Sequence, residues 1–124
     1  MGTILVADDD RDIRELVSFK LTQAGHQVHT TDDGRKALDS IMNDCPDLAI
    51  LDVMMPGLSG VDVIRQVRAD AEIRGLRIIL LTARAQEGDV QAGFSVGADD
   101  YVDKPFSPRA LMSRVTALLA RGQP

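Results

Sequence analysis

Acidic, hydroxyl and basic side chains stand directly after the short apolar runs of this sequence, where they could bind a metal ion and a phosphoryl group. The residues concerned are Asp8, Asp9, Asp10, Asp52, Thr82 and Lys104. Carboxylates that share a crevice repel one another, so either the pKa of one of them rises or the group binds a cation. Magnesium prefers carboxylate and phosphate oxygens as ligands, while a lysine ammonium and a threonine hydroxyl suit the other phosphoryl oxygens. The set therefore predicts metal-assisted phosphoryl chemistry, provided that the fold brings these residues together.

Each of these residues has a simpler explanation when it is taken alone. A single aspartate after a strand is more often a turn residue or a helix cap, and Asp10 fits the N-cap of the segment that follows it. Thr82 could simply end a strand, and Lys104 could be an ordinary surface amine. The joint occurrence of such residues after four of the five apolar runs favours a shared site.

Five short apolar runs of the β type alternate with stretches that are long enough for a helix. We expect strands at residues 3–7, 27–31, 48–51, 77–81 and 101–102. Helical spacing of apolar residues predicts a helix after the first, second, third and fifth runs. The last helix would begin at Ser107-Pro108, a favourable N-cap and first-turn pair. The helix after the fourth run is less well supported, because Gly88, Gly93 and Gly97 disfavour helix formation there.

This alternation predicts an α/β fold with a doubly wound, five-stranded parallel sheet and helices on both faces, because each parallel crossover needs a connection of about a dozen residues. The third and fourth runs are continuously apolar, which is typical of central strands covered on both sides. Ligands of such sheets bind beyond the carboxyl ends of the strands. The acids and Lys104 stand at those ends.

The composition limits the class of protein. With 124 residues, 44% of them apolar, the chain is sized for one domain, expected at residues 1–121, with residues 122–124 as a tail or the start of a linker. A net charge of -5 opposes direct binding of nucleic acid. No apolar stretch suits a membrane span and no basic leader is visible, so we expect a cytoplasmic protein without membrane contact. The single cysteine, Cys45, cannot form an internal disulfide and is expected to be a small buried residue.

Four motifs in this order resemble the receiver domains of bacterial response regulators, and the resemblance covers about residues 3–120. The motifs are ILVADD at 4–9, LDVMMPG at 51–57, LLTA at 80–83 and GADDYVDKPF at 97–106. The sequence looks closest to the receivers of winged-helix transcription regulators. The resemblance implies a flavodoxin-like sheet with strand order 2-1-3-4-5, in which the first and third strands are neighbours. It also implies a phosphorylation switch whose donor is the phosphohistidine of a sensor histidine kinase or phosphotransfer protein.

The resemblance further implies roles for individual residues. Asp52 would accept the phosphoryl group, and Asp9 would bind Mg2+ directly, with Mn2+ as an alternative ion. Asp8 would reach the metal through water, and the backbone carbonyl of Met54 would complete the ligands. Thr82 and Lys104 would contact the phosphoryl oxygens. Thr82 and Tyr101 would change conformation on phosphorylation, and Met54 and Arg84 would control hydrolysis of the acyl phosphate. The Lys104-Pro105 peptide is expected to be cis.

The resemblance also suggests what the switch controls. The face formed by the fourth helix, fifth strand and fifth helix would act on an output domain or a downstream protein, with transcription regulation as the expected outcome. Asp99, Asp100 and Arg114 match charged positions of a dimer interface in such relatives, whereas Val90 and Ala110 lack one charged pair. We therefore expect a weak or phosphorylation-dependent homodimer. The end of the chain favours a receiver cut from a longer regulator.

Three other classes of protein share parts of this pattern. A magnesium-dependent aspartyl phosphatase-like enzyme of the haloacid dehalogenase kind would want a second acid two residues after its nucleophile, where this chain has Met54. The intact set of acids argues against a pseudo-receiver that acts only as a binding module. The aromatic content of only 3% argues against a flavin-binding module. We expect a signalling switch that catalyses only its own phosphotransfer and dephosphorylation.

Overall fold

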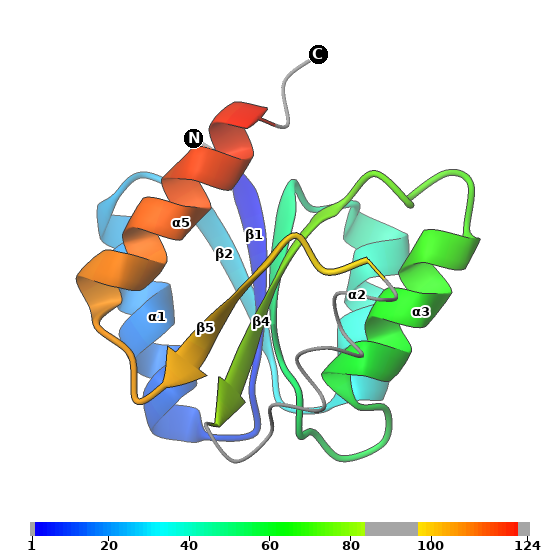
Figure 1. Ribbon diagram of the computed structural model, residues 1–124, viewed down its shortest axis with the longest axis horizontal. Helices are drawn as coiled ribbons and strands as arrows, with labels where there is room; N and C mark the ends of the chain where they lie inside the picture. Colours follow the sequence, from blue (N-terminus) through cyan, green and yellow to red (C-terminus); the bar gives the residue numbers. More distant parts are fainter. Residues whose placement is uncertain (1, 84–96, 122–124) are drawn as a thin grey trace.

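The computed structural model of the chain describes residues 2–83 and 97–121. The described elements are β1 (Thr3–Ala7), α1 (Arg11–Gln23), β2 (Gln27–Thr31), α2 (Gly34–Asp44), β3 (Leu48–Asp52), α3 (Gly60–Ala69), β4 (Arg77–Ala83), β5 (Asp100–Lys104) and α5 (Pro108–Arg121). The strands form one parallel sheet in the order β2-β1-β3-β4-β5, so the predicted doubly wound fold is confirmed (Figure 1). The fourth helix expected from the sequence, with Gly88 and Gly93, falls outside the described residues.

Three strands extend further than their apolar runs predict. β3 includes Asp52, β4 continues to Ala83, and β5 begins at Asp100 and ends at Lys104. The reason is that a strand is held by its backbone ladder, which does not require an apolar side chain. Asp52 is still paired with Leu81, and Lys104 with Ala83. Asp52 and Lys104 are therefore the last residues of their strands, where the ladder fixes the positions of their backbones.

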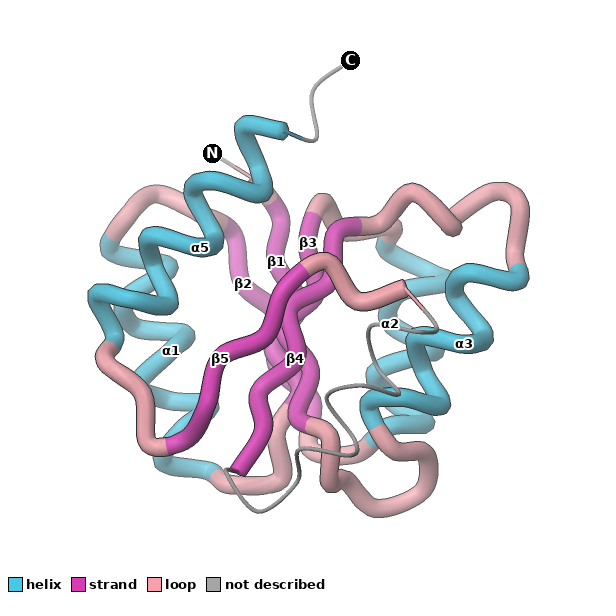
Figure 2. Tube along the Cα trace, in the orientation of Figure 1, coloured by secondary structure: helices cyan, strands magenta, loops and turns pink. Residues whose placement is uncertain are grey.

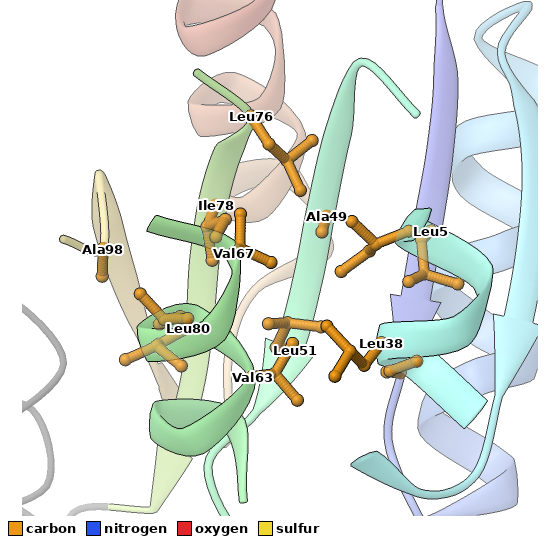
Figure 3. Packing of buried hydrophobic residues seen from close by; sticks show 14 of the residues in the cluster. Leu5, Leu38, Ala49, Leu51, Val63, Val67, Leu76, Ile78, Leu80 and Ala98 are labelled. Atoms are coloured by element: carbon orange, nitrogen blue, oxygen red, sulfur yellow. The ribbon is translucent and has the colours of Figure 1, made fainter. Parts of the chain in front are cut away.

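In the described part of the chain, two helices lie on each face of the sheet. α1 and α5 lie on one face, and α2 and α3 lie on the other (Figures 1 and 2). Side chains of a strand alternate between the two faces, so Ile4 belongs to the core under α1 and α5, and Leu5 to the core under α2 and α3. Figure 3 shows the second core, where Leu38 of α2 and Val63 of α3 lie near Leu51. Residues of β3 are buried along its whole length, as predicted for a central strand.

Polar caps set the ends of several helices. Asp10 caps α1 as predicted, because its carboxylate accepts the N–H of Asp12 at 2.9 Å. Ser59 and Asp62 form a reciprocal capping box at the start of α3, with both bonds at 3.1 Å. α2 ends at Cys45 in a left-handed conformation with φ 46°, and this turn leaves the side chain exposed, so the expected burial of Cys45 was wrong. Among the described helices, none has the length and apolar character needed to cross a membrane.

Candidate functional site

Three carboxylates converge at the carboxyl edge of the sheet, as the strand order requires. Asp8 follows β1 and Asp52 ends β3, and these two strands are paired through Ala7 and Leu51. One carboxylate oxygen each of Asp8, Asp9 and Asp52 lies within 4.8 Å of the others. Asp8 and Asp52 are buried, whereas Asp9 is exposed. The fold thus brings together the three acids that we expected to share a metal.

Lys104 brings a positive charge to these acids from β5. β4 separates β5 from β3 in the sheet, so the lysine side chain must reach across a strand. Its Nζ atom lies 2.8 Å from Oδ2 of Asp8 and 3.3 Å from Oδ2 of Asp52. The side chain is 20% exposed, so most of it is shielded from water. The peptide between Lys104 and Pro105 is cis, as expected.

The carboxylate of Asp8 is only partly satisfied by its neighbours. Oδ1 accepts the backbone N–H of Asp10 at 2.9 Å. Oδ2 is buried, and no described donor meets it with hydrogen-bond geometry, so its contact with Lys104 is an ion pair and not a directed hydrogen bond. A buried acceptor left without a donor is costly. A hard divalent cation such as Mg2+ binds oxygen ligands of this kind, so the residues at this edge fit a magnesium ion.

Among the described residues of this cluster, negative charge exceeds positive charge, because three carboxylates surround the ammonium group of Lys104. The pKa of Asp52 is raised from 3.8 to about 6, first by burial and then by the charge of Asp8, while Lys104 and the backbone N–H of Met54 oppose the shift. Burial acts to lower the pKa of Lys104, but its contacts with Asp8 and Asp52 outweigh burial and raise that pKa. At neutral pH the acids are therefore crowded, and the lysine stays charged.

The other predicted site residues lie around this cluster in different ways. Thr82 is buried in β4, one residue beyond Leu81, which pairs with Asp52. Tyr101 in β5 is 36% exposed, and the side chain of Met54 just after β3 is 57% exposed. Asp10 serves as the helix cap described above. Arg84 lies outside the described residues.

Two neighbouring acids that we expected at a dimer interface have different surroundings. The carboxylate of Asp99 accepts the backbone N–H of Ile78 at 2.8 Å and pairs with Arg68 at 3.1 Å, and its side chain is 18% exposed. Asp100 forms an ion pair with Arg114 of α5 near the surface. The carboxylate of Asp99 is thus engaged within the chain. A role for these residues in an interface remains a prediction.

Sequence reasoning missed two arginines that hold the backbone. The guanidinium of Arg68, in the last turn of α3, donates to the carbonyls of Gly97, Arg74 and Leu76. Arg14 of α1 donates to the carbonyl of Asp8 at 2.8 Å. Neither contact leaves a motif in the sequence, because a backbone carbonyl is present at every residue.

The fold and the site together define an α/β domain that is equipped for metal-assisted phosphoryl chemistry at its strand ends. Residues 4–116 match the family model described as response regulator receiver domain. The chain belongs to this family, and it is a receiver domain of a two-component response regulator.

Relatives with known names and structures agree with this assignment. Response regulator MprA of Mycolicibacterium vanbaalenii is 47% identical over 121 residues, which cover 98% of this chain and 52% of the relative. The chain thus spans about half the length of the curated relatives that it matches. The receiver domain of Francisella response regulator 1452 has a TM-score of 0.90 at 32% identity, covering 99% of this chain and all of that one. Chemotaxis response regulator CheY4 of Vibrio cholerae has a TM-score of 0.89 at 34% identity, covering 95% and 98%.

Proposed function

We propose that Asp52 accepts a phosphoryl group from a phosphohistidine, and that the phosphorylated chain then acts on an output domain or partner protein. The observation that carries this proposal is the cluster of three acids and Lys104 at the carboxyl edge of the sheet. Three carboxylate oxygens lie within 4.8 Å of one another there, and Nζ of Lys104 lies 2.8 Å and 3.3 Å from two of the acids. Asp52 ends the central strand of the sheet, so its backbone is held firmly.

The proposed transfer makes one bond and breaks another. A carboxylate oxygen of Asp52 bonds to phosphorus, and the bond between phosphorus and the donor's imidazole nitrogen breaks. The electron pair of the broken bond stays on the imidazole. With a pKa of about 6, Asp52 is mostly ionised at neutral pH and is therefore available as a nucleophile. The ammonium of Lys104 and the hydroxyl of Thr82 are assigned to oxygens of the transferred group.

Asp8, Asp9 and Asp52, with the backbone carbonyl of Met54, are the residues that would hold Mg2+, or Mn2+ in its place. When bound, the ion supplies positive charge that offsets the negative charge of the transferring group. The carboxylates of Asp8 and Asp52 are buried and lie beside Lys104, with its Nζ atom 2.8 Å and 3.3 Å away. We assign Met54 and Arg84 to control of water access, which sets how quickly hydrolysis of the acyl phosphate resets the switch.

A phosphoryl group adds about 1.5 to 2 negative charges, so it can reorganise the segments that contact it. In this proposal Thr82 moves toward the phosphoryl group, and Tyr101 follows it inward. The ring of Tyr101 is 36% exposed on β5, so an inward movement would change the outer surface of that strand. Asp100 precedes Tyr101 in β5 and forms an ion pair with Arg114 of α5. The signal would thus leave through the face that includes β5 and α5.

A receiver domain implies a histidine kinase as donor and an output domain as target. We propose both for this protein, together with a weak or phosphorylation-dependent homodimer. The net charge of -5 argues against direct contact of this domain with nucleic acid. The alternative of an aspartyl phosphatase-like enzyme is not favoured, because Met54 occupies the position where such an enzyme would carry its second acid.

Intact-mass measurement after incubation with a small acyl phosphate and Mg2+ tests this proposal. The native chain should gain one phosphoryl group only when the metal is present. Asp52→Asn should gain none, because an amide cannot form the acyl phosphate under the same conditions. Asp10→Asn is the matched control, since it removes an acid from the same edge but retains a side chain that can cap α1.

The Asp10→Asn control should be labelled like the native chain. Equal labelling of the native chain and Asp52→Asn would place the acceptor elsewhere, and labelling of the native chain without any divalent metal would contradict the assigned role of the acid cluster.

A further inference from the structure

Arg14 makes a contact with the backbone of the acid cluster that the roles assigned so far do not use. It lies in the first turns of α1 and is half-buried. Its Nη1 atom donates to the carbonyl oxygen of Asp8 at 2.8 Å. The contact joins the first helix to the residue that immediately follows β1.

The carbonyl of Asp8 needs such a donor because the strand ladder has already ended. The pairing of β1 with β2 and β3 stops at Ala7. Beyond it, the N–H of Asp8 donates to the carbonyl of Thr31 at 3.2 Å, and its carboxylate accepts the N–H of Asp10. Arg14 therefore provides the hydrogen bond that the sheet no longer supplies to this carbonyl.

That carbonyl also sets the position of Asp9. The carbonyl of Asp8 and the N–H of Asp9 belong to one planar peptide unit, so a donor that fixes the carbonyl fixes the direction in which the chain enters Asp9. Asp9 is exposed, and no side-chain hydrogen bond from the described part of the chain holds its carboxylate. Its place in the cluster thus depends on the backbone that Arg14 holds.

We propose that Arg14 is a positioning residue of the cation site, which acts by fixing the peptide between Asp8 and Asp9. The inference rests on the proposed function, because it takes these two acids as metal ligands. Groups that hydrogen-bond to metal-ligating residues and orient them commonly contribute about tenfold to a hundredfold to metal affinity. A contribution in that range is expected here.

The sign of the effect separates positioning from charge. Arg14 is a cation close to a cation site, so its charge alone disfavours metal binding. If charge were the dominant effect, removal of Arg14 would strengthen Mg2+ binding. If the hydrogen bond to Asp8 is the dominant effect, removal of Arg14 weakens Mg2+ binding although a repulsive charge has been deleted.

Calorimetric titration of the native chain with MgCl2, compared with Arg14→Met, Arg14→Lys and Arg11→Met, tests this inference. We expect the Kd of Arg14→Met to rise by about tenfold or more, and Arg14→Lys to recover part of the loss. Arg11→Met is the matched control, because Arg11 is on the same helix but its side chain is 79% exposed and pairs with Glu15. Its Kd should stay within about twofold of the native value, since exposed charges are screened by salt.

A second measurement tests the inference if a variant is poorly folded. The Mg2+ concentration for half-maximal phosphoryl labelling should rise in Arg14→Met, while the extent of labelling at saturating Mg2+ stays near the native extent. Thermal melting without metal identifies any variant that has lost its fold, and Arg14→Lys then serves in place of Arg14→Met. Mg2+ binding by Arg14→Met as tight as in the native chain, or tighter, overturns the inference.

Failure of the inference is distinguishable from failure of the proposed function. A native chain that binds no Mg2+, or that binds it equally well after Asp9→Asn, would remove the metal site itself and both proposals with it. A native chain that binds Mg2+ through Asp9 while Arg14→Met binds equally well would remove only the role of Arg14.

Discussion

Two cationic side chains, Lys104 and Arg68, are buried to the same extent but have opposite surroundings. Each is 20% exposed and contacts at least one carboxylate. Lys104 stands at the carboxyl edge of the sheet, where the acids outnumber it and Oδ2 of Asp8 has no hydrogen-bond donor among the described residues. Arg68 stands near the start of β4, where its donors meet Asp99 and several backbone carbonyls.

The difference lies in whether the polar groups satisfy one another. Around Arg68 the positive charge is matched by one carboxylate, which also accepts the N–H of Ile78. A polar set that is satisfied in this way makes the surrounding structure rigid. Around Lys104 the described residues leave a surplus of negative charge, which a bound cation would offset. A cluster that is stable without a ligand is structural, whereas one that is strained without a ligand is suited to binding.

Arg68→Ala should give the largest effect on stability. The change leaves Asp99 as a largely buried charge without its partner and deprives the carbonyls of Gly97 and Leu76 of a donor. Removing one partner of a buried ion pair typically costs about 3 to 5 kcal/mol in the free energy of unfolding. Urea denaturation followed by circular dichroism measures the change.

Arg65→Ala is the matched control for Arg68, because Arg65 is on the same helix but its side chain is 62% exposed and pairs with Asp62 on the surface. Its effect should be less than about 1 kcal/mol. Equal losses in the two variants would show that the buried set around Arg68 is no more stabilising than a surface ion pair, and the comparison with Lys104 would lose its basis.

Asp52→Asn should change the free energy of unfolding in the opposite direction and stabilise the metal-free chain. The pKa of Asp52 is about 6 in the folded chain against an ordinary 3.8, so the folded state binds the proton more tightly than the unfolded state does. Stability from this group is present below pH 3.8 and is lost as the pH rises through about 6. After a discount for screening by solvent, the loss should be on the order of 1 to 3 kcal/mol in the free energy of unfolding. Asp52→Asn should not show this loss, because its amide does not titrate.

Urea denaturation of the native chain and Asp52→Asn at a series of pH values measures this difference, because the two chains differ only at this residue. The gap should open between pH 4 and 7 and close when Mg2+ is added, since bound metal stabilises the native chain. A gap that does not change with pH would show that the acid cluster is not strained in the absence of metal.

The sequence predicted the acid cluster because the strand order converts distant residues into neighbours. Asp8 and Asp52 stand at the ends of apolar runs that β-type patterns reveal, and parallel strands bring those ends to one edge. The lengths of β3, β4 and β5 were underestimated, because apolar patterning does not report a backbone ladder that continues under polar side chains. Arg14 and Arg68 were missed for a related reason, since each binds carbonyl groups that no side-chain pattern marks.

Sequence reasoning also did not distinguish two neighbouring residues of one type. Asp99 and Asp100 are identical in type and adjacent in sequence, yet one is enclosed by Arg68 and the other pairs with Arg114 near the surface. Consecutive residues of an extended chain point to opposite sides, so the register of β5 decides which acid faces which partner. That register depends on pairing with β4, which cannot be derived from the acids themselves.

Asp100→Asn should have the smallest effect on stability and extends the comparison to a third ion pair. The side chains of Asp100 and Arg114 are 24% and 49% exposed, so breaking their pair should change the free energy of unfolding by less than about 1 kcal/mol.

A pair that is so easily broken within the chain is free to be exchanged for one between two chains. Sedimentation of the chain loaded with beryllofluoride and Mg2+, a phosphoryl mimic, should therefore show weaker self-association for Asp100→Asn than for Asp103→Asn, which removes the same charge from the other side of β5. Equal association of the two variants would exclude Asp100 from the dimer interface and leave its pair with Arg114 a local surface contact.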